Sequence, residues 1–511
     1  MTEVAAATAG EVDSSSLFVR FSFTRDALLT ASKAWLNALP NGLAAKPDEV
    51  ATYVHELAHY LQYTTTPYGL FLHYCRLLQN QATIDLMRIV FAAGVEIRPP
   101  LSLQSLPLSG AAAEAAGAAL ESWWNIENVV ASFGADGARR LDVIGRYVDN
   151  FTGVQEDGRP THPPLLDLGT GFALIQSHIA QFISLFNEIG FKAVPDAPLF
   201  PDGIDRAALD AAGAAQVSSE DRAADRVASA LDLLGDPWDA AAIIESAAKA
   251  AEFWQTDITR DRLVAWANRS VDQQLMVYRT CLLRGLDAIP TPDAQSFLMS
   301  YMALCELTMF APLLPQHAAL RQRAPGLETL LPSRRFSRLL SIATKVEPMR
   351  DRSDHQRYVN DLCAALDWPT PQEIVQLSTD APERVRNPVA FLYQSAQRWR
   401  VWDSTTFLGI DPLLLSQGED AERWRTTFNF VIVQFADRTT FHKDKDFLRS
   451  MTVRYLEMLG LQTVMRGDSL RMRAPYSGGS DETRWMTSYL QERFTSLFPG
   501  RDFSSVEFLD A

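Results

Sequence analysis

The pattern of apolar and polar positions along the chain predicts a mainly α-helical protein with little sheet. Residues 16–23, SLFVRFSF, alternate large apolar residues with polar ones and give the clearest strand signal. Beyond them, apolar residues recur mostly with the helical period. The helices predicted in this way span about 48–63, 69–93, 110–133, 171–189, 221–234, 237–254, 261–284 and 291–310. Further helical patterns follow a Pro-containing connection at 312–332 and reach Phe498, with one strand predicted near 469–474.

Composition along the chain suggests how it is divided. Residues 155–164 and 194–219 are rich in Pro, Gly, Asp or Ala, which is typical of surface insertions or linkers. A boundary near 320–335 is expected to separate a core from a carboxyl-terminal helical region. The predicted organisation is a disordered leader at 1–15, a catalytic-type domain at 16–320 and a helical region at 335–511.

Charge and composition exclude several classes of function. The chain has 511 residues and a formal charge of −15, which repels phosphate backbones and anionic lipid surfaces. No basic patch overrides it, so we expect neither nucleic acid nor membrane as a partner. The first sixteen residues have no basic and apolar signal-peptide pattern, so cytoplasmic residence is the default expectation. The four cysteines are far apart and are expected to be buried thiols: Cys75, Cys281, Cys305 and Cys363.

One motif carries a specific chemistry. Residues 55–62 read HELAHYLQ, and on a helix the i, i+4 spacing places the imidazoles of His55 and His59 side by side. Two such nitrogens can bind one Zn²⁺ at about 2.0–2.1 Å. Glu56 points to the flank, where it can hold a metal-bound water without binding the metal itself. The arrangement suits activation of water by a Lewis acid and a general base together.

The residues around the motif support a helix that lines a cleft. An apolar stripe of Val50, Val54, Leu57 and Leu61 lies roughly opposite the two histidines. Between residues 50 and 75 the sole formal charge is that of Glu56, whereas an ordinary surface helix would carry several. The alternative is that the two histidines and a glutamate merely satisfy hydrogen bonds in the core. Another polar residue of the same helix, Gln62, is expected to be a structural amide and not a ligand.

A third zinc ligand has to come from elsewhere, because Thr65 occupies the position of the third histidine in the HExxHxxGxxH pattern. The segment DPWDAAAIIESAAKAAEFW at 236–254 has helix-start signals and an Ala-rich surface that permits close helix packing, with Glu245 at its centre. Glu245 could instead be exposed and paired with Lys249. Glu252 is expected to be a solvated charge, with a contact to a ligand imidazole as the alternative. Two other residues remain open as third ligand, Glu121 and His178.

HELAHYLQ followed by TTTPYGL resembles a loose group of poorly characterised bacterial HExxH proteins of the gluzincin type. The resemblance extends to IIES at 243–246 and, more weakly, to LCELTMFAPLLP at 304–315. It implies His55, His59 and Glu245 as zinc ligands and Glu56 as the base. One departure is QSHIA at 176–180, which also resembles the glutamate-bearing helix but has Gln176 where a carboxylate is expected.

The fold expected from these observations is mainly α (α+β), with a zincin-like helical core, a small amino-terminal sheet and a carboxyl-terminal helical region. The expected function is a zinc metallopeptidase that hydrolyses a peptide or protein substrate. Candidate donors to the oxyanion are Tyr63, Tyr68, His73 and Tyr278. Hydrolysis of a non-peptide amide would use the same residues. The alternative is a catalytically silent binding or regulatory protein on the same scaffold, with the carboxyl-terminal helical region available to a protein partner.

Overall fold

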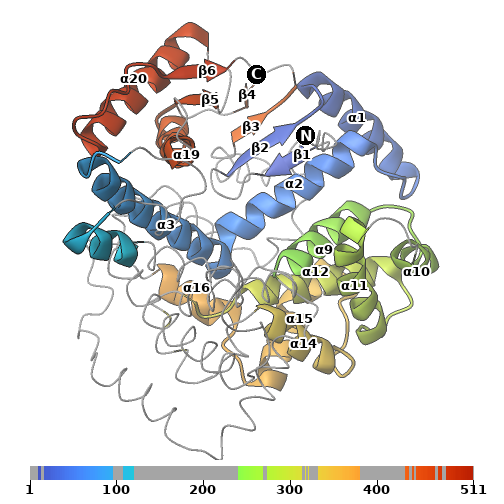
Figure 1. Ribbon diagram of the computed structural model, residues 1–511. Helices are drawn as coiled ribbons and strands as arrows, with labels where there is room; N and C mark the ends of the chain where they lie inside the picture. Colours follow the sequence, from blue (N-terminus) through green and yellow to red (C-terminus); the bar gives the residue numbers. More distant parts are fainter. Residues whose placement is uncertain are drawn as a thin grey trace, which may run out of the picture.

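The protein is mainly α-helical, as the sequence pattern predicts, in this computed structural model of the chain (Figure 1). The structure describes residues 10–12, 17–95, 108–119, 240–268, 273–313, 317, 320, 332–379, 432–436, 440–441, 445–465, 470–474 and 479–509. The helices with both ends in these ranges are α1 (Arg25–Ala38), α2 (Asp48–Thr65), α3 (Pro67–Ala92), α9 (Ala240–Phe253), α10 (Arg260–Asn268), α11 (Gln273–Ala288), α12 (Ala294–Met309), α14 (Pro332–Ala343), α15 (His355–Leu366), α16 (Pro371–Thr379), α19 (Lys445–Met465) and α20 (Gly479–Leu497). The strands are β1 (Gly10–Val12), β2 (Phe18–Phe21), β3 (Ile432–Gln434), β4 (Thr440–Phe441), β5 (Arg471–Arg473) and β6 (Glu507–Leu509). Among these helices, none combines the length and the apolar character that a membrane span requires.

Helix α2, which carries the HELAH motif, lies in the middle of the molecule between the small sheet and α9 (Figure 1). Asp48 and Glu49 stand in its first turn, where negative charge is favourable beside the helix dipole. The apolar stripe predicted from the sequence is buried, with Val50 and Val54 fully covered. The opposite face of the helix is therefore the one that carries the histidines.

The junction between α2 and α3 fixes where the first of these helices ends. The hydroxyl of Thr66 donates to the carbonyl of Gln62 and accepts a hydrogen bond from the amide of Gly69 at 3.1 Å. Pro67 suits the first turn of α3, because a backbone N–H at this position would have no hydrogen-bond partner within the helix. A Cβ on residue 69 would lie 2.2 Å from the carbonyl oxygen of Tyr63, so glycine allows the two helices to approach closely at this turn.

A four-stranded sheet of order β1-β2-β3-β4 packs against α2 through β1 and β2. β1 and β2 are antiparallel, β2 and β3 are parallel, and β3 and β4 are antiparallel. The parallel pair joins residues 18–20 to residues 432–434, so strands from both sides of the predicted boundary share one sheet. The division into 16–320 and 335–511 stays a prediction. The disordered leader predicted at 1–15 is wrong for Gly10–Val12, because these residues form β1 by backbone pairing with β2.

Helix α12 is buried from Phe297 to Met309 and forms the centre of the helical layer below α2. It contacts α9, α11, α14 and α15, which explains its largely apolar sequence. Its last carbonyls are satisfied by the buried guanidinium of Arg335, which donates to Leu307 at 2.8 Å and to Thr308 at 3.1 Å. A cation at this end also complements the helix dipole. Burial lowers the pKa of Arg335 to about 10, which still leaves it charged at neutral pH.

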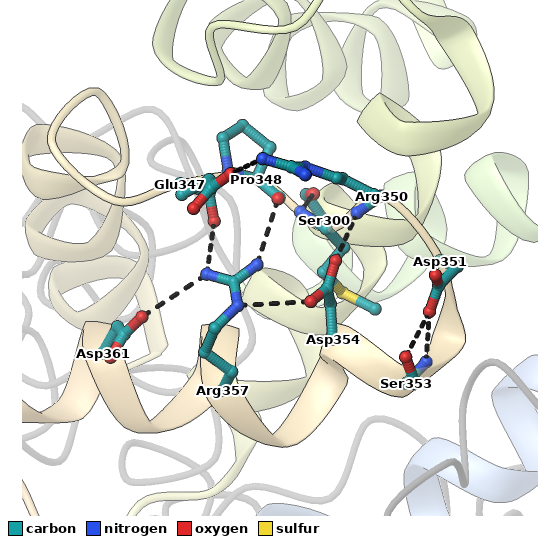
Figure 2. A network of polar contacts seen from close by, with 10 residues as sticks. Ser300, Glu347, Pro348, Arg350, Asp351, Ser353, Asp354, Arg357 and Asp361 are labelled. Carbon is teal, nitrogen blue, oxygen red and sulfur yellow. Dashed lines mark hydrogen bonds and ion pairs between the residues drawn. The ribbon is translucent and has the colours of Figure 1, made fainter.

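The link between α14 and α15 is held by a polar network around Arg357 (Figure 2). Arg357 contacts Asp354 at 3.2 Å and donates to the carbonyls of Glu347 and Pro348. The amide of Met349 donates to the buried hydroxyl of Ser300 on α12. The same link places Arg352 4.5 Å from the ring centre of Trp254, directly after α9. The network therefore ties α15 to α12 and supports the end of α9.

Other predicted elements compare with the structure as follows. The helix predicted at 237–254 is α9, and the strand predicted near 469–474 contains β5. The helix predicted at 261–284 is described as two helices, α10 and α11, with residues 269–272 outside the described part. Residues 110–119 are helical, whereas the rest of the helix predicted at 110–133 and those at 171–189 and 221–234 lie outside the described residues. The linkers predicted at 155–164 and 194–219 lie outside them too.

Candidate metal centre

Helices α2 and α9 pack against each other in antiparallel directions. Near the end of α2, the side-chain amide of Gln62 donates to the carbonyl of Ile244 at 3.0 Å. Just before α2, the ammonium of Lys46 donates to the carbonyls of Ala251 at 3.1 Å and Trp254 at 2.6 Å. Lys46 thus satisfies carbonyls that the end of α9 leaves free and brings positive charge to the negative end of its dipole. No sequence signal identified this lysine in advance.

Small residues on α9 allow the two helices to approach closely, as the Ala-rich sequence predicts. Ala248 is fully buried, three residues after Glu245 and four before Glu252. That spacing places all three on one face of the helix. Because Ala248 has a single methyl group, the two glutamates beside it can reach the side chains of α2.

Three ligand-type atoms from these helices meet at one point. His55 Nε2 lies 3.1 Å from His59 Nε2, and Glu245 Oε2 lies 3.1 Å from His59 Nε2 and 3.3 Å from His55 Nε2. These residues form the one group among the described residues that could hold a metal ion. Ligand atoms held at 2.0–2.1 Å by a tetrahedral zinc ion lie about 3.3–3.4 Å apart. The observed triangle therefore has the size that a zinc ion requires.

The side chain of Gln62 determines which nitrogen of His59 carries the proton. The amide nitrogen of Gln62 donates to Ile244, so its oxygen Oε1 is the atom that faces His59 Nδ1 at 3.0 Å. An amide oxygen only accepts hydrogen bonds, so His59 Nδ1 is the donor. In the neutral imidazole, His59 Nε2 then presents a lone pair to the Glu245 carboxylate. Gln62 is a structural amide, as expected, and its structural task is to orient a ligand.

The second histidine is flanked by two carboxylates. His55 Nε2 faces Glu245, while His55 Nδ1 lies 2.7 Å from Glu252 Oε1, close enough for an ion pair although not well aligned for a hydrogen bond. Glu252 is buried to a large extent and also pairs with Lys249. The prediction of a solvated Glu252 is therefore wrong, and its alternative as a partner of the imidazole is correct. Lys249 pairs with Glu252, whereas Glu245 faces the histidines.

The two carboxylates also change the protonation of the site. Burial lowers the pKa of His55, but Glu245 and Glu252 outweigh it and raise this pKa to about 9. Burial raises the pKa of Glu245, and the two imidazoles more than offset it, so this pKa lies well below its usual range. Without a metal ion, a proton on His55 balances the carboxylates. A dication would take over that role, because both ligand nitrogens then direct lone pairs at one point with a carboxylate oxygen.

Glu56 lies beside this group and has surroundings that suit a base. It is buried to 7% exposure, one residue after His55 and three before His59 on α2. Burial, reinforced by the charges of Glu245 and Glu11 and opposed by the two histidines, raises its pKa above the usual value. A raised pKa brings a carboxylate closer to the operating pH, where general base catalysis is most effective.

Among the candidates for an oxyanion donor, the structure favours Tyr63 by position. Tyr63 follows His55 and His59 at intervals of four residues, which places it on the same face of α2. Burial and the charge of Glu245 raise the pKa of Tyr63 to about 12, so its hydroxyl keeps its proton. Tyr68 and His73 are buried residues of α3.

The remaining candidates can be placed only in part. Glu121, Gln176 and His178 lie outside the described residues, as does the side chain of Tyr278. The four cysteines are buried free thiols, as predicted. Comparisons with protein-family models, with curated proteins and with solved structures found no match to this chain.

Proposed function

We propose that the chain is a zinc-dependent hydrolase of the HExxH metallopeptidase type, with a zincin-like core around α2 and α9. His55, His59 and Glu245 are the ligands and Glu56 is the general base. The single observation that carries the proposal is the triangle of His55 Nε2, His59 Nε2 and Glu245 Oε2, with edges of 3.1–3.3 Å. Three such atoms at these distances can share one cation, and two imidazoles with a carboxylate are a ligand set that zinc accepts.

Each residue has a separate task in this proposal. The metal supplies Lewis acidity, which polarises the scissile carbonyl and acidifies water. Glu56 accepts a proton from the attacking water and passes it to the leaving amine. Gln62 and Glu252 orient the two imidazoles, and Tyr63 offers a hydroxyl to the developing oxyanion. The substrate class is a peptide or protein, and a non-peptide amide would use the same groups.

Metal analysis of four proteins tests the ligand set. The unchanged chain is expected to bind about one equivalent of zinc, and the His55→Ala, His59→Ala double variant none. Glu245→Ala should weaken zinc binding markedly. Lys249→Ala is the matched control on the same helix, because it removes an ion pair with Glu252 and cation–π contacts to Phe253 and Trp266 but no proposed ligand. Stoichiometric zinc in the double variant, or equal effects of Glu245→Ala and Lys249→Ala, would disprove this ligand set.

Replacement of Glu56 by Gln tests the reaction. The amide still hydrogen-bonds water but cannot accept its proton, so Glu56→Gln is expected to keep zinc and fold while hydrolysis stops. Undiminished hydrolysis in this variant would remove Glu56 from the role of base. Loss of zinc would make Glu56 a ligand instead.

A second candidate function, a silent zincin scaffold that binds peptides, is favoured by one observation. Strand β1 lies directly against Glu56, the residue that we propose as the base. The scaffold hypothesis predicts that zinc-loaded protein cleaves no peptide even after β1 has been displaced. The hydrolase hypothesis predicts that cleavage then appears.

A further inference from the structure

Strand β1 lies over the carboxylate that we assign as the base. It pairs antiparallel to β2, with Gly10 opposite Phe21 and Val12 opposite Val19, and it packs against α2. A Cβ atom added to Gly10 would lie 2.6 Å from Glu56 Cγ and 3.0 Å from Glu56 Oε1. The backbone of β1 is therefore in contact with the Glu56 side chain.

This contact leaves no room for another peptide between β1 and Glu56. Neighbouring strands of a sheet are about 4.7–4.9 Å apart. A general base has to reach its proton donor within about 2.6–3.2 Å. Because Gly10 fills that distance on the side of Oε1, an external peptide can reach Glu56 from this side only by taking the place of β1.

The neighbouring strand offers such a peptide a pairing edge. β1 is the outermost strand of the sheet, so β2 has an unpaired edge as soon as β1 leaves. Exposed edges of this kind bind extended peptides through main-chain hydrogen bonds. β1 contains three residues, and the side chain of Glu11 is exposed, so the strand is held by one short run of pairing with β2 and by its packing against α2.

We infer that β1 occupies a peptide-binding groove between β2 and α2, whose ligand is an extended peptide with glycine or another small residue above Glu56. A small residue is needed there because a larger one would collide with Glu56 and with Thr52 Cγ2, which lies 2.8 Å from the added Cβ. β1 and the ligand compete for the groove, so β1 keeps the site closed until it leaves. The inference rests on the proposed function for the role of Glu56, while the groove itself rests on the position of β1.

Displacement of β1 in the full-length chain tests the inference. Gly10→Val adds bulk against Glu56, and Gly10→Asp adds a like charge beside it, so each is expected to expel β1 by a different mechanism. The probe is a fluorescent peptide of the sequence ATAGEVDS, residues 7–14, added in the presence of a chelator so that no cleavage occurs. Both variants should bind it at least about tenfold more tightly than the unchanged chain (about 1.4 kcal/mol).

Two matched controls make the result specific. Glu11→Gln changes an exposed side chain of the same strand, so β1 stays in place and peptide binding stays weak. A probe with Val in place of its Gly should not bind to any of the proteins. Thermal unfolding within a few degrees of the unchanged chain verifies that the variants fold, and faster hydrogen exchange at Phe18–Phe21 verifies that β1 has left. Equal binding by the Gly10 variants and the unchanged chain, or no binding by any protein, overturns the inference.

Zinc-loaded proteins separate this inference from the proposed function. If the Gly10 variants bind the peptide and none of them cleaves a peptide, the groove stands and the hydrolase proposal fails. If the unchanged chain cleaves peptides as fast as the Gly10 variants, β1 does not close the site, and the inference fails while the hydrolase proposal stands.

Discussion

At the scale of single residues, the polarity of one amide sets the chemistry of the site. Gln62 can present its oxygen to His59 only because its nitrogen is used by the carbonyl of Ile244. The hydrogen bond then directs the lone pair of His59 Nε2 toward Glu245. A residue that touches no metal ion therefore determines whether a ligand nitrogen is available.

Substitution of Gln62 tests this orienting role. Gln62→Ala should weaken zinc binding by about 10- to 100-fold, because His59 loses the acceptor that fixes its ring and tautomer. Gln62→Glu should weaken it less, since it keeps an acceptor for His59 Nδ1 and loses only the donor to Ile244. Competition with a chelator of known affinity measures both. If the two variants bind zinc equally, orientation through Nδ1 has no measurable effect.

The protonation of His55 predicts how the metal-free protein responds to pH. Its pKa is about 9 in the folded chain, against about 6.5 unfolded. A raised pKa stabilises the fold fully below the unfolded value, and this contribution is lost as pH rises through 9. Between pH 6.5 and 8, the free energy of unfolding should therefore fall by about 1.5 kcal/mol.

Urea unfolding in the presence of a chelator measures this loss. The range ends at pH 8 because burial also raises the pKa of the Cys305 and Cys363 thiols. At higher pH these thiols make the free energy of unfolding fall further. His55→Gln is the control, and it should remove most of the pH dependence between 6.5 and 8. An equal fall in the variant would show that another group is responsible.

At the scale of elements, the site depends on how closely α2 and α9 approach each other. Lys46 and Gln62 hold the two helices at opposite ends, and the ligands lie between them. Ala248 lies in the same face of α9 as Glu245 and Glu252. The volume of this one side chain thus limits the distance between the ligands.

Enlargement of Ala248 should separate the helices. Ala248→Leu is expected to cost about 1–3 kcal/mol of stability through overpacking and to abolish zinc binding at micromolar concentration. Ala250→Leu is the matched control, because Ala250 is equally buried but lies on the other side of α9. It should cost similar stability while zinc binding persists. Zinc binding by Ala248→Leu at the level of the Ala250→Leu variant would show that helix spacing does not control the site.

At the scale of the whole molecule, the carboxyl-terminal region completes structures that begin in the amino-terminal one. β3 pairs with β2, and α14 and α15 cover α12. Arg335 caps α12 from beyond the predicted boundary. Elements from both sides of the predicted boundary therefore pack in one sheet and one helical layer.

A fragment of residues 1–320 tests the independence of the predicted catalytic domain. It lacks β3, Arg335 and the helices that cover α12, so apolar surface that is fully buried in the whole chain would face water. We expect no cooperative thermal unfolding for this fragment, whereas the full chain should unfold cooperatively. Cooperative unfolding of the fragment at a temperature within a few degrees of that of the full chain would show that residues 1–320 fold independently.

The sequence by itself determined the features that depend on local spacing. The i, i+4 histidines, the buried stripe and the start of α2, and the end of α9 follow from helical periodicity and turn residues, which act within a few positions. Tertiary structure alone decided which distant carboxylates meet the histidines. Glu245 is 186 positions from His59, and the sequence favoured it as third ligand without excluding Glu121 or His178, because helix packing decides which distant side chains meet. Tertiary structure also decided that Glu252 contacts His55 and that Lys46 binds the end of α9. The three residues of β1 form a strand because they pair with β2, and no pattern of their own predicts it.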